Sequence, residues 1–114
     1  MTDCIFCKII AGEVPSSRLY QDGRVTAFRD INPVAPTHIL IVPNQHIASV
    51  NVLTEADEQL VGQLFTTARQ LAEEEGIQES GYRLIINTGK DGGQDVQHLH
   101  LHLIGGHKMR HPMG

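Results

Sequence analysis

The stretch His98-Leu99-His100-Leu101-His102-Leu103 is the part of this 114-residue chain that decides its fold. Its residues alternate strictly between histidine and leucine, and successive side chains of an extended strand project from opposite faces. A strand over residues 98–104 therefore turns the leucines toward a core and the imidazoles toward the other face. The alternative is a surface strand whose polar face happens to be histidine. Because the chain has seven histidines and three of them lie in register here, we expect a functional site on the imidazole face.

The segments before this strand predict a sheet packed against one long helix. From Glu55 to about Glu75 the apolar residues repeat with a helical period, between a capping box at Thr54 and Asp57 and a terminating Gly76. The expected apolar stripe comprises Leu60, Val61, Leu64, Phe65, Ala68, Leu71 and Ala72. The remaining patterns predict a helix over residues 4–11, strands over residues 17–21 and 24–29 joined by the turn Asp22-Gly23, and strands over residues 37–42 and 82–87.

Together these elements predict an α+β fold with a five-stranded, mainly antiparallel sheet, one long helix and a short N-terminal helix. No linker, repeat or low-complexity tract divides the chain, so we expect residues 1–114 to form a single domain. A chain of this length buries roughly two-thirds of the surface that its unfolded form exposes, which is enough for a core without disulfide bonds.

The charge balance excludes several classes of partner. The chain has 9 basic and 13 acidic side chains, and it contains neither a basic run nor a basic amphipathic helix. We therefore expect it to bind no nucleic acid and no membrane. The apolar runs are far shorter than the ~20 residues that a membrane span requires, and the N-terminus lacks the pattern of a secretory signal. These features predict a cytoplasmic protein.

A glycine-rich loop over residues 88–95 precedes the histidine strand. Its paired Gly92 and Gly93 allow backbone N–H groups to approach an anion closely, as in phosphate-binding loops. Because this loop leads directly into the imidazoles, it brings phosphate donors close to candidate nucleophiles and acids. The pattern indicates chemistry on a phosphate group.

Cys4 and Cys7 are the only cysteines, and their spacing of one helical turn allows two thiolates to bind one tetrahedral zinc ion. Such a site needs two further ligands. The alternatives are a pair of small buried hydrophobic side chains and a redox-active dithiol, although no strand precedes the pair as it does in thioredoxin-like proteins. We expect a structural zinc ion.

The pattern from His98 to Ile104 resembles the signature of the histidine triad (HIT) family, in which three histidines alternate with apolar residues. The resemblance spans nearly the whole chain and is strongest to the Hint branch, the purine nucleoside phosphoramidases. It rests on Ile5-Phe6, Lys8-Ile9-Ile10, Phe28, Asp30-Ile31, Ala35-Pro36-Thr37-His38, Asn87 and Asp91-Gly92-Gly93-Gln94. It implies a homodimer whose two five-stranded sheets join, with a purine mononucleotide or nucleoside phosphoramidate bound to each protomer.

The resemblance also implies a role for each matching residue. The catalytic residues would be His100 as nucleophile, His102 at the phosphate, and His98 and His38 in the same imidazole network. The nucleotide-binding residues would be Ile5, Phe6, Ile9, Phe28, Asp30, Ile31, Leu40, Asn87, Gly93, Gln94, Asp95 and Val96. Zinc-containing members imply His46 and His98 as the ligands that join Cys4 and Cys7. A zinc-bound His98 could not also protonate a leaving group.

The implied reaction is hydrolysis of a nucleoside 5′-monophosphoramidate, of the AMP-amine or AMP-lysine type, through a nucleotidyl-histidine intermediate and without a required cofactor. A non-catalytic nucleotide-binding module and a dinucleoside polyphosphate hydrolase are the alternatives. From the residues alone, Asp30 is either a ribose clamp or a turn-capping carboxylate. Asp95 stands where many Hint-like members have serine, so it either acts as the acid for the leaving group or points away. The C-terminal tail also differs, with His111-Pro112 in place of the Trp-Pro of eukaryotic members.

Overall fold

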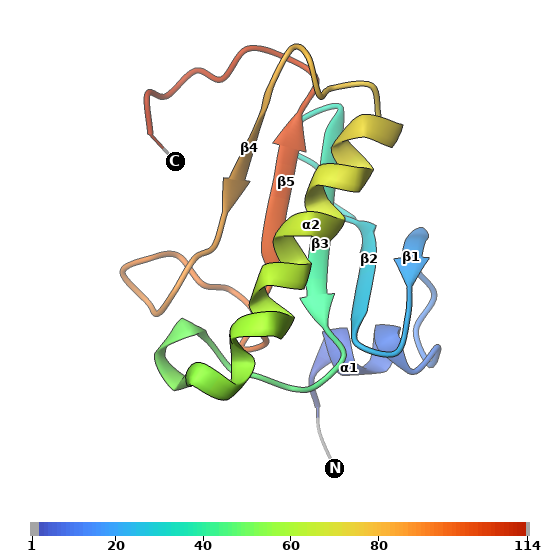
Figure 1. Cartoon of the computed structure of the whole chain (residues 1–114), viewed down its shortest axis with the longest axis vertical. Helices are drawn as coiled ribbons and strands as arrows, with labels where there is room; N and C mark the ends of the chain where they lie inside the picture. Colours follow the sequence, from blue (N-terminus) through green and yellow to red (C-terminus); the bar gives the residue numbers. More distant parts are fainter. Residues whose placement is uncertain (1–2, 114) are drawn as a thin grey trace.

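One antiparallel sheet of five strands, in the order β1-β2-β3-β5-β4, forms the centre of the molecule (Figure 1). The structure is a computed structural model that describes residues 3–113. Its elements are α1 (Ile5–Ile10), β1 (Arg18–Gln21), β2 (Val25–Arg29), β3 (Thr37–Pro43), α2 (Glu58–Glu74), β4 (Tyr82–Ile85) and β5 (Leu101–Gly105), with single 3-10 turns over Val50–Val52 and Glu55–Asp57. The predicted α+β fold with one long helix is confirmed.

The two faces of the sheet carry separate apolar clusters, because side chains alternate along the central strands. Ile39 and Ile41 of β3 belong to the larger cluster, which α2 covers with Leu60, Leu64, Ala68 and Leu71. Leu40 and Val42 belong to the smaller cluster on the opposite face, together with Phe6 and Ile9 of α1. The short helix and the long helix therefore lie against opposite faces of the same strands, as Figure 1 allows the reader to follow.

Helix α2 begins as the sequence predicts. The Thr54 hydroxyl accepts a hydrogen bond from the Ala56 amide (3.3 Å), and the Asp57 carboxylate accepts one from the Thr54 amide (3.0 Å). The first turn is a 3-10 turn, so the α-helix proper starts at Glu58. Gly76, with φ 74°, follows the last turn as a glycine in the left-handed region.

Phe65 corrects the predicted apolar stripe, because its side chain is 42% exposed. It lies about 100° around the helix axis from Leu64, which puts it at the margin of the buried face. Thr67, one helical turn beyond Leu64, is buried instead. The face of α2 toward the sheet is thus narrower than the apolar residues alone suggest.

The histidine segment keeps its predicted alternation but not its predicted start. Leu99, Leu101 and Leu103 all lie in the cluster beneath α2, yet β5 pairs with β3 only from Leu101 onward. Pro43 ends β3 at this point and has no amide hydrogen to donate. The Leu99 amide instead donates to the carbonyl of Ile47 (2.7 Å), in the segment that follows β3.

The other four strands also differ from the expected bounds by one or two residues, since β1 begins at Arg18, β2 begins at Val25, β3 includes Pro43 and β4 ends at Ile85. None of the helices in residues 3–113 is both long enough and apolar enough to cross a membrane.

Replacement of Leu103 by alanine should lower the free energy of unfolding by about 2–5 kcal/mol, because it opens a cavity beneath α2. Leu103 is fully buried, whereas Leu19 on the edge strand β1 is 36% exposed. The matched control Leu19→Ala should cost less than about 1 kcal/mol. Urea denaturation measures both, and equal losses in the two variants would contradict the described core.

Candidate functional site

A cavity of about 840 Å³ opens on the face of the sheet that α1 covers. A row of paired residues crosses three strands here, because Phe28 of β2 is opposite Leu40 of β3, and Leu40 is opposite His102 of β5. Helix α1 adds a second apolar wall. The predicted nucleotide-binding or catalytic residues that line the cavity are Ile5, Phe6, Ile9, Phe28, Asp30, Ile31, Leu40, Asp95, Val96, His100 and His102. Apolar side chains of α1, β2 and β3 therefore share this cavity with polar imidazole and carboxylate groups.

His100 has the geometry of a nucleophile. Its Nδ1 lies 2.7 Å from the carbonyl oxygen of His98, so Nδ1 carries the proton of the neutral ring and donates it to that carbonyl. The lone pair then sits on Nε2, on a ring that lines the cavity. The Phe6 ring packs edge-on against the same imidazole, with centroids 5.1 Å apart. Backbone and aromatic contacts thus fix both the tautomer and the orientation of His100.

His38 and His102 form a directed hydrogen-bond chain behind the cavity wall. The Val34 amide donates to His38 Nδ1 (3.2 Å), so the proton of neutral His38 is on Nε2, which lies 2.9 Å from His102 Nδ1. His102 then accepts at Nδ1 and carries its own proton on Nε2. His38 itself does not line the cavity. It orients His102, which does.

The imidazoles of both His38 and His102 are neutral near pH 7. Burial lowers the pKa of His102 to about 4, with a further contribution from the neighbouring His100 and His38. Burial also lowers the pKa of His38, although the carboxylate of Asp30 partly opposes this effect. His102 therefore offers a neutral N–H donor to a ligand in the cavity.

Asp30 caps a turn and also lines the cavity. One carboxylate oxygen accepts a hydrogen bond from the Asn32 amide (2.8 Å) and so caps the turn after β2. The other oxygen lies 3.4 Å from His38 Nε2. Because Asp30 also lines the cavity, its carboxylate can accept hydrogen bonds from a hydroxyl-bearing ligand.

Asn87, Gly93 and Gln94 do not line the cavity but brace the loop beside it. The Gln94 side chain is fully engaged, since its oxygen accepts from the Gly89 amide (3.0 Å) and its nitrogen donates to the carbonyls of Ala48 (2.8 Å) and Val96 (3.0 Å). The side-chain Nδ2 of Asn87 donates to the Gly92 carbonyl (2.8 Å). A Cβ on Gly92 would collide with the Thr88 carbonyl, so the tight fold of this loop requires glycine there.

One wall of the cavity consists of residues that the sequence does not indicate. The additional lining residues are Val14, Pro15, Ser16, Ser17, Arg29 and Asn32. Most of them belong to the irregular segment between α1 and β1, where no periodic pattern gives a signal.

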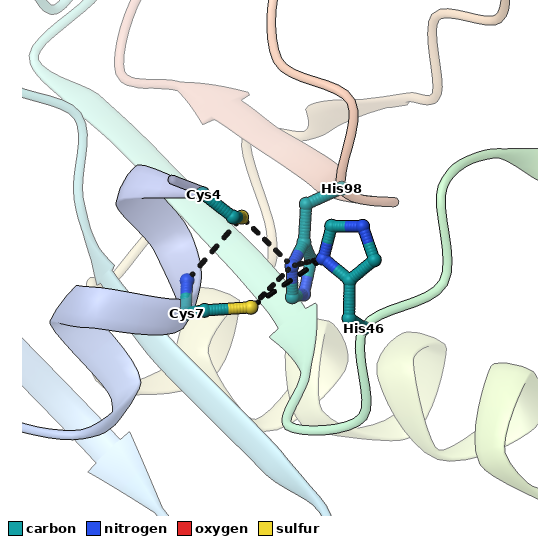
Figure 2. A group of neighbouring side chains, drawn as sticks. All are labelled: Cys4, Cys7, His46 and His98. Carbon is teal, nitrogen blue, oxygen red and sulfur yellow. Dashed lines mark hydrogen bonds between the residues drawn. The ribbon is translucent and has the colours of Figure 1, made fainter. Parts of the chain in front are cut away.

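A second cluster contains the four residues expected to bind zinc (Figure 2). His98 Nδ1 lies 3.3 Å from Cys4 Sγ, 3.6 Å from Cys7 Sγ and 3.2 Å from His46 Nδ1, and Cys7 Sγ lies 3.4 Å from His46 Nδ1. All four atoms lie within 4.8 Å of one another. The edges of a tetrahedral zinc site with Zn–N and Zn–S bonds of roughly 2.0–2.3 Å are about 3.3–3.8 Å long. The observed distances and the Cys₂His₂ donor set therefore fit a zinc ion.

His98 belongs to this cluster rather than to the cavity. Its Nε2 lies 2.9 Å from the Pro43 carbonyl, so Nε2 donates and Nδ1 keeps the lone pair that faces the cysteines. Burial lowers the pKa of His98, which favours the neutral form that a metal requires. Burial, followed by the hydrogen bond and charge of Cys4, raises the pKa of the Cys7 thiol in the absence of metal.

Comparison with known proteins gives consistent results at the level of domain, sequence and structure. The sequence matches the HIT domain over residues 11–109. It is 57% identical, over 91% of this chain and 87% of the relative, to the purine nucleoside phosphoramidase of Escherichia coli (strain K12). A HIT family hydrolase from Legionella pneumophila superposes with a TM-score of 0.95 at 47% identity, covering 98% of this chain and 100% of that one.

A HIT family hydrolase from Clostridium thermocellum superposes with a TM-score of 0.93 at 50% identity, covering 96% of this chain and 95% of that one. The structural similarity thus extends through the sheet, both helices and the loop that precedes β5. On the domain match and these identities, the chain belongs to the HIT family.

Proposed function

We propose that this chain is a purine nucleoside phosphoramidase, a hydrolase that cleaves the P–N bond of nucleoside 5′-monophosphoramidates. The observation that carries the proposal is the lone pair of His100 Nε2, on a ring that lines a cavity with apolar walls from α1, β2 and β3. The similarity to the purine nucleoside phosphoramidase of Escherichia coli supports the same reaction. A module that only binds nucleotides would not require a positioned nucleophile.

In the proposed complex, the purine packs among the apolar side chains of α1, β2 and β3, and the ribose hydroxyls donate to Asp30. The phosphate lies at His102 Nε2–H and the backbone of residues 95–96. His100 Nε2 attacks phosphorus and forms a P–N bond to the imidazole, while the bond to the leaving amine breaks and the amine takes up a proton. Water then attacks the nucleotidyl-histidine, which releases the nucleoside monophosphate and restores His100. No cofactor takes part in these steps.

We further propose that Cys4, Cys7, His46 and His98 hold one structural zinc ion. The distances of 3.2–3.6 Å among their donor atoms support this assignment, as does the donor set. The ion would link α1 to the segment after β3, which contains His46, and to the segment before β5, which contains His98. It would not contact the substrate. With His98 bound to zinc, the proton for the leaving amine comes from water or another group.

We also propose that residues 1–114 form a single HIT domain. Two copies of the chain would then form a homodimer in which the two sheets join. The outer edge of β4 is unpaired within the described chain, and Phe65 and Val52 leave apolar surface exposed.

The use of two thiolates as metal ligands agrees with a cytoplasmic location, where cysteines stay reduced.

Replacement of His100 by alanine should reduce turnover of a fluorogenic adenosine phosphoramidate by several orders of magnitude and leave nucleotide affinity nearly unchanged, because only the covalent route is removed. Quenched-flow trapping with labelled substrate should detect an acid-labile nucleotidyl adduct in the wild type and none in His100→Ala. Nucleotide binding without turnover by the wild type would identify a binding module instead. Near-normal turnover by the variant would show that another group attacks phosphorus.

Protein purified without chelator should contain close to one zinc ion per chain, and Cys7→Ser should lose it together with thermal stability. Elemental analysis and a thermal melt before and after chelation measure the two effects. Zinc-free protein with an unchanged melting temperature would mean that the two cysteines are ordinary core residues.

Light scattering at micromolar concentration should give about twice the chain mass of 12.6 kDa. Dilution through the micromolar range tests whether the association is stable. A monomer throughout that range would remove the support for a sheet shared between protomers.

A further inference from the structure

Asp95 lies where two cavities meet. The cavity that contains His100 adjoins a second one of about 420 Å³, and Ile5, Asp95 and Val96 line both. The second cavity is completed by Asp3, Cys4, His46 and Gln97. Any group attached to a phosphorus atom in front of His100 therefore has this second cavity within reach.

The Asp95 carboxylate lies beside the nucleophilic atom of His100, on a largely exposed side chain. Its Oδ1 lies 3.6 Å from His100 Nε2, and the side chain is 80% exposed. In the nucleophilic tautomer Nε2 carries a lone pair, so it cannot donate a hydrogen bond to the carboxylate. An entering phosphoryl group would also repel the carboxylate, and the exposed side chain can then turn toward the second cavity, which it also lines.

No lysine or arginine is available to balance the charge of Asp95 in either cavity, and the proposed zinc ion is neutralised by its own two thiolates. Among the described lining residues of the two cavities, the one Lys or Arg is Arg29. Its guanidinium is bound to both carboxylate oxygens of Glu75, at 2.9 and 2.8 Å. Asp3 adds a second carboxylate to the smaller cavity. The region beside the leaving group thus carries negative charge.

From this arrangement we propose that Asp95 makes the enzyme select substrates whose leaving amine carries an additional positive charge and discriminate against those that carry a negative one. The inference rests on the proposed phosphoramidase function and specifies the class of amine in its substrates. When the P–N bond breaks, a nearby carboxylate stabilises a cationic amine and repels an anionic one. One unit charge about 6 Å away in a partly solvated site changes the specificity constant by about three- to tenfold.

Three adenosine 5′-monophosphoramidates test the proposal, each made from a primary alkylamine of equal length that ends in an ammonium, a hydroxyl or a carboxylate. For the wild type, kcat/KM should fall in that order, with about a tenfold or greater difference between the first and the last. In Asp95→Asn the three values should come within about threefold of one another. Comparison of ratios between enzymes cancels the intrinsic reactivity of each substrate.

Asp91→Asn is the matched control, because it removes the same charge from the same loop at an exposed residue that lines neither cavity. It should keep the wild-type ratios, and Asp95→Glu should keep them as well. A rise in ionic strength should compress the ratios of the wild type, which tests the electrostatic origin without any variant.

Turnover by the wild type with equal preference for the three substrates, or wild-type ratios in Asp95→Asn, would overturn this inference and leave the proposed function intact. Absence of turnover with all three substrates would overturn the proposed function and the inference together.

Discussion

The burial of Leu99, Leu101 and Leu103 beneath α2 is the constraint on which the functional side of this molecule depends. Because these leucines are anchored in the core, the histidines between them have to project from the opposite face. There each imidazole meets a different neighbour. His98 meets the cysteines, His100 meets Phe6 and the cavity, and His102 meets His38. One buried face thus supports three chemically distinct environments on the other.

The cysteine–histidine cluster and the cavity around His100 are connected through the backbone of His98. The carbonyl of His98 accepts the proton of His100 Nδ1, while the ring of His98 faces the cysteine cluster. The residue that belongs to the candidate metal site therefore also fixes the tautomer of the candidate nucleophile. A displacement of His98 would disturb that hydrogen bond, even though the His98 side chain does not line the cavity.

Sequence reasoning was most successful where local and tertiary preferences agree. The capping box at Thr54 and the His–Leu alternation each specify one local geometry, and both are present in the structure. The start of β5 could not be predicted, because it depends on where the partner strand β3 ends at Pro43. The exposure of Phe65 likewise depends on the width of the contact between α2 and the sheet, which a helical period alone does not define.

The candidate site also contains some residues whose positions follow from local sequence patterns and others whose positions do not. Residues of the strands and of α1 reach the cavity as expected, since alternation and helical spacing fix their direction. Gln94 and Asn87 are engaged with neighbouring backbone groups, and only the three-dimensional path of their loop reveals those partners. The wall formed by Val14, Pro15 and Ser16 carries no signal in the sequence, because this segment between α1 and β1 has no periodic structure.

Helix α1 has only six residues, too few for a stable helix in isolation. It nevertheless supplies Phe6 and Ile9 to the cavity. Cys4 caps its N-terminus, Cys7 lies within it, and Arg18 donates a hydrogen bond to its Ile9 carbonyl (2.8 Å). A metal ion bound to the two cysteines would hold this wall in place before a ligand arrives. The entropy cost of ordering α1 would then arise when the protein folds and not when a ligand binds. Ligand affinity would no longer be lowered by a population of molecules in which this wall of the cavity is unformed.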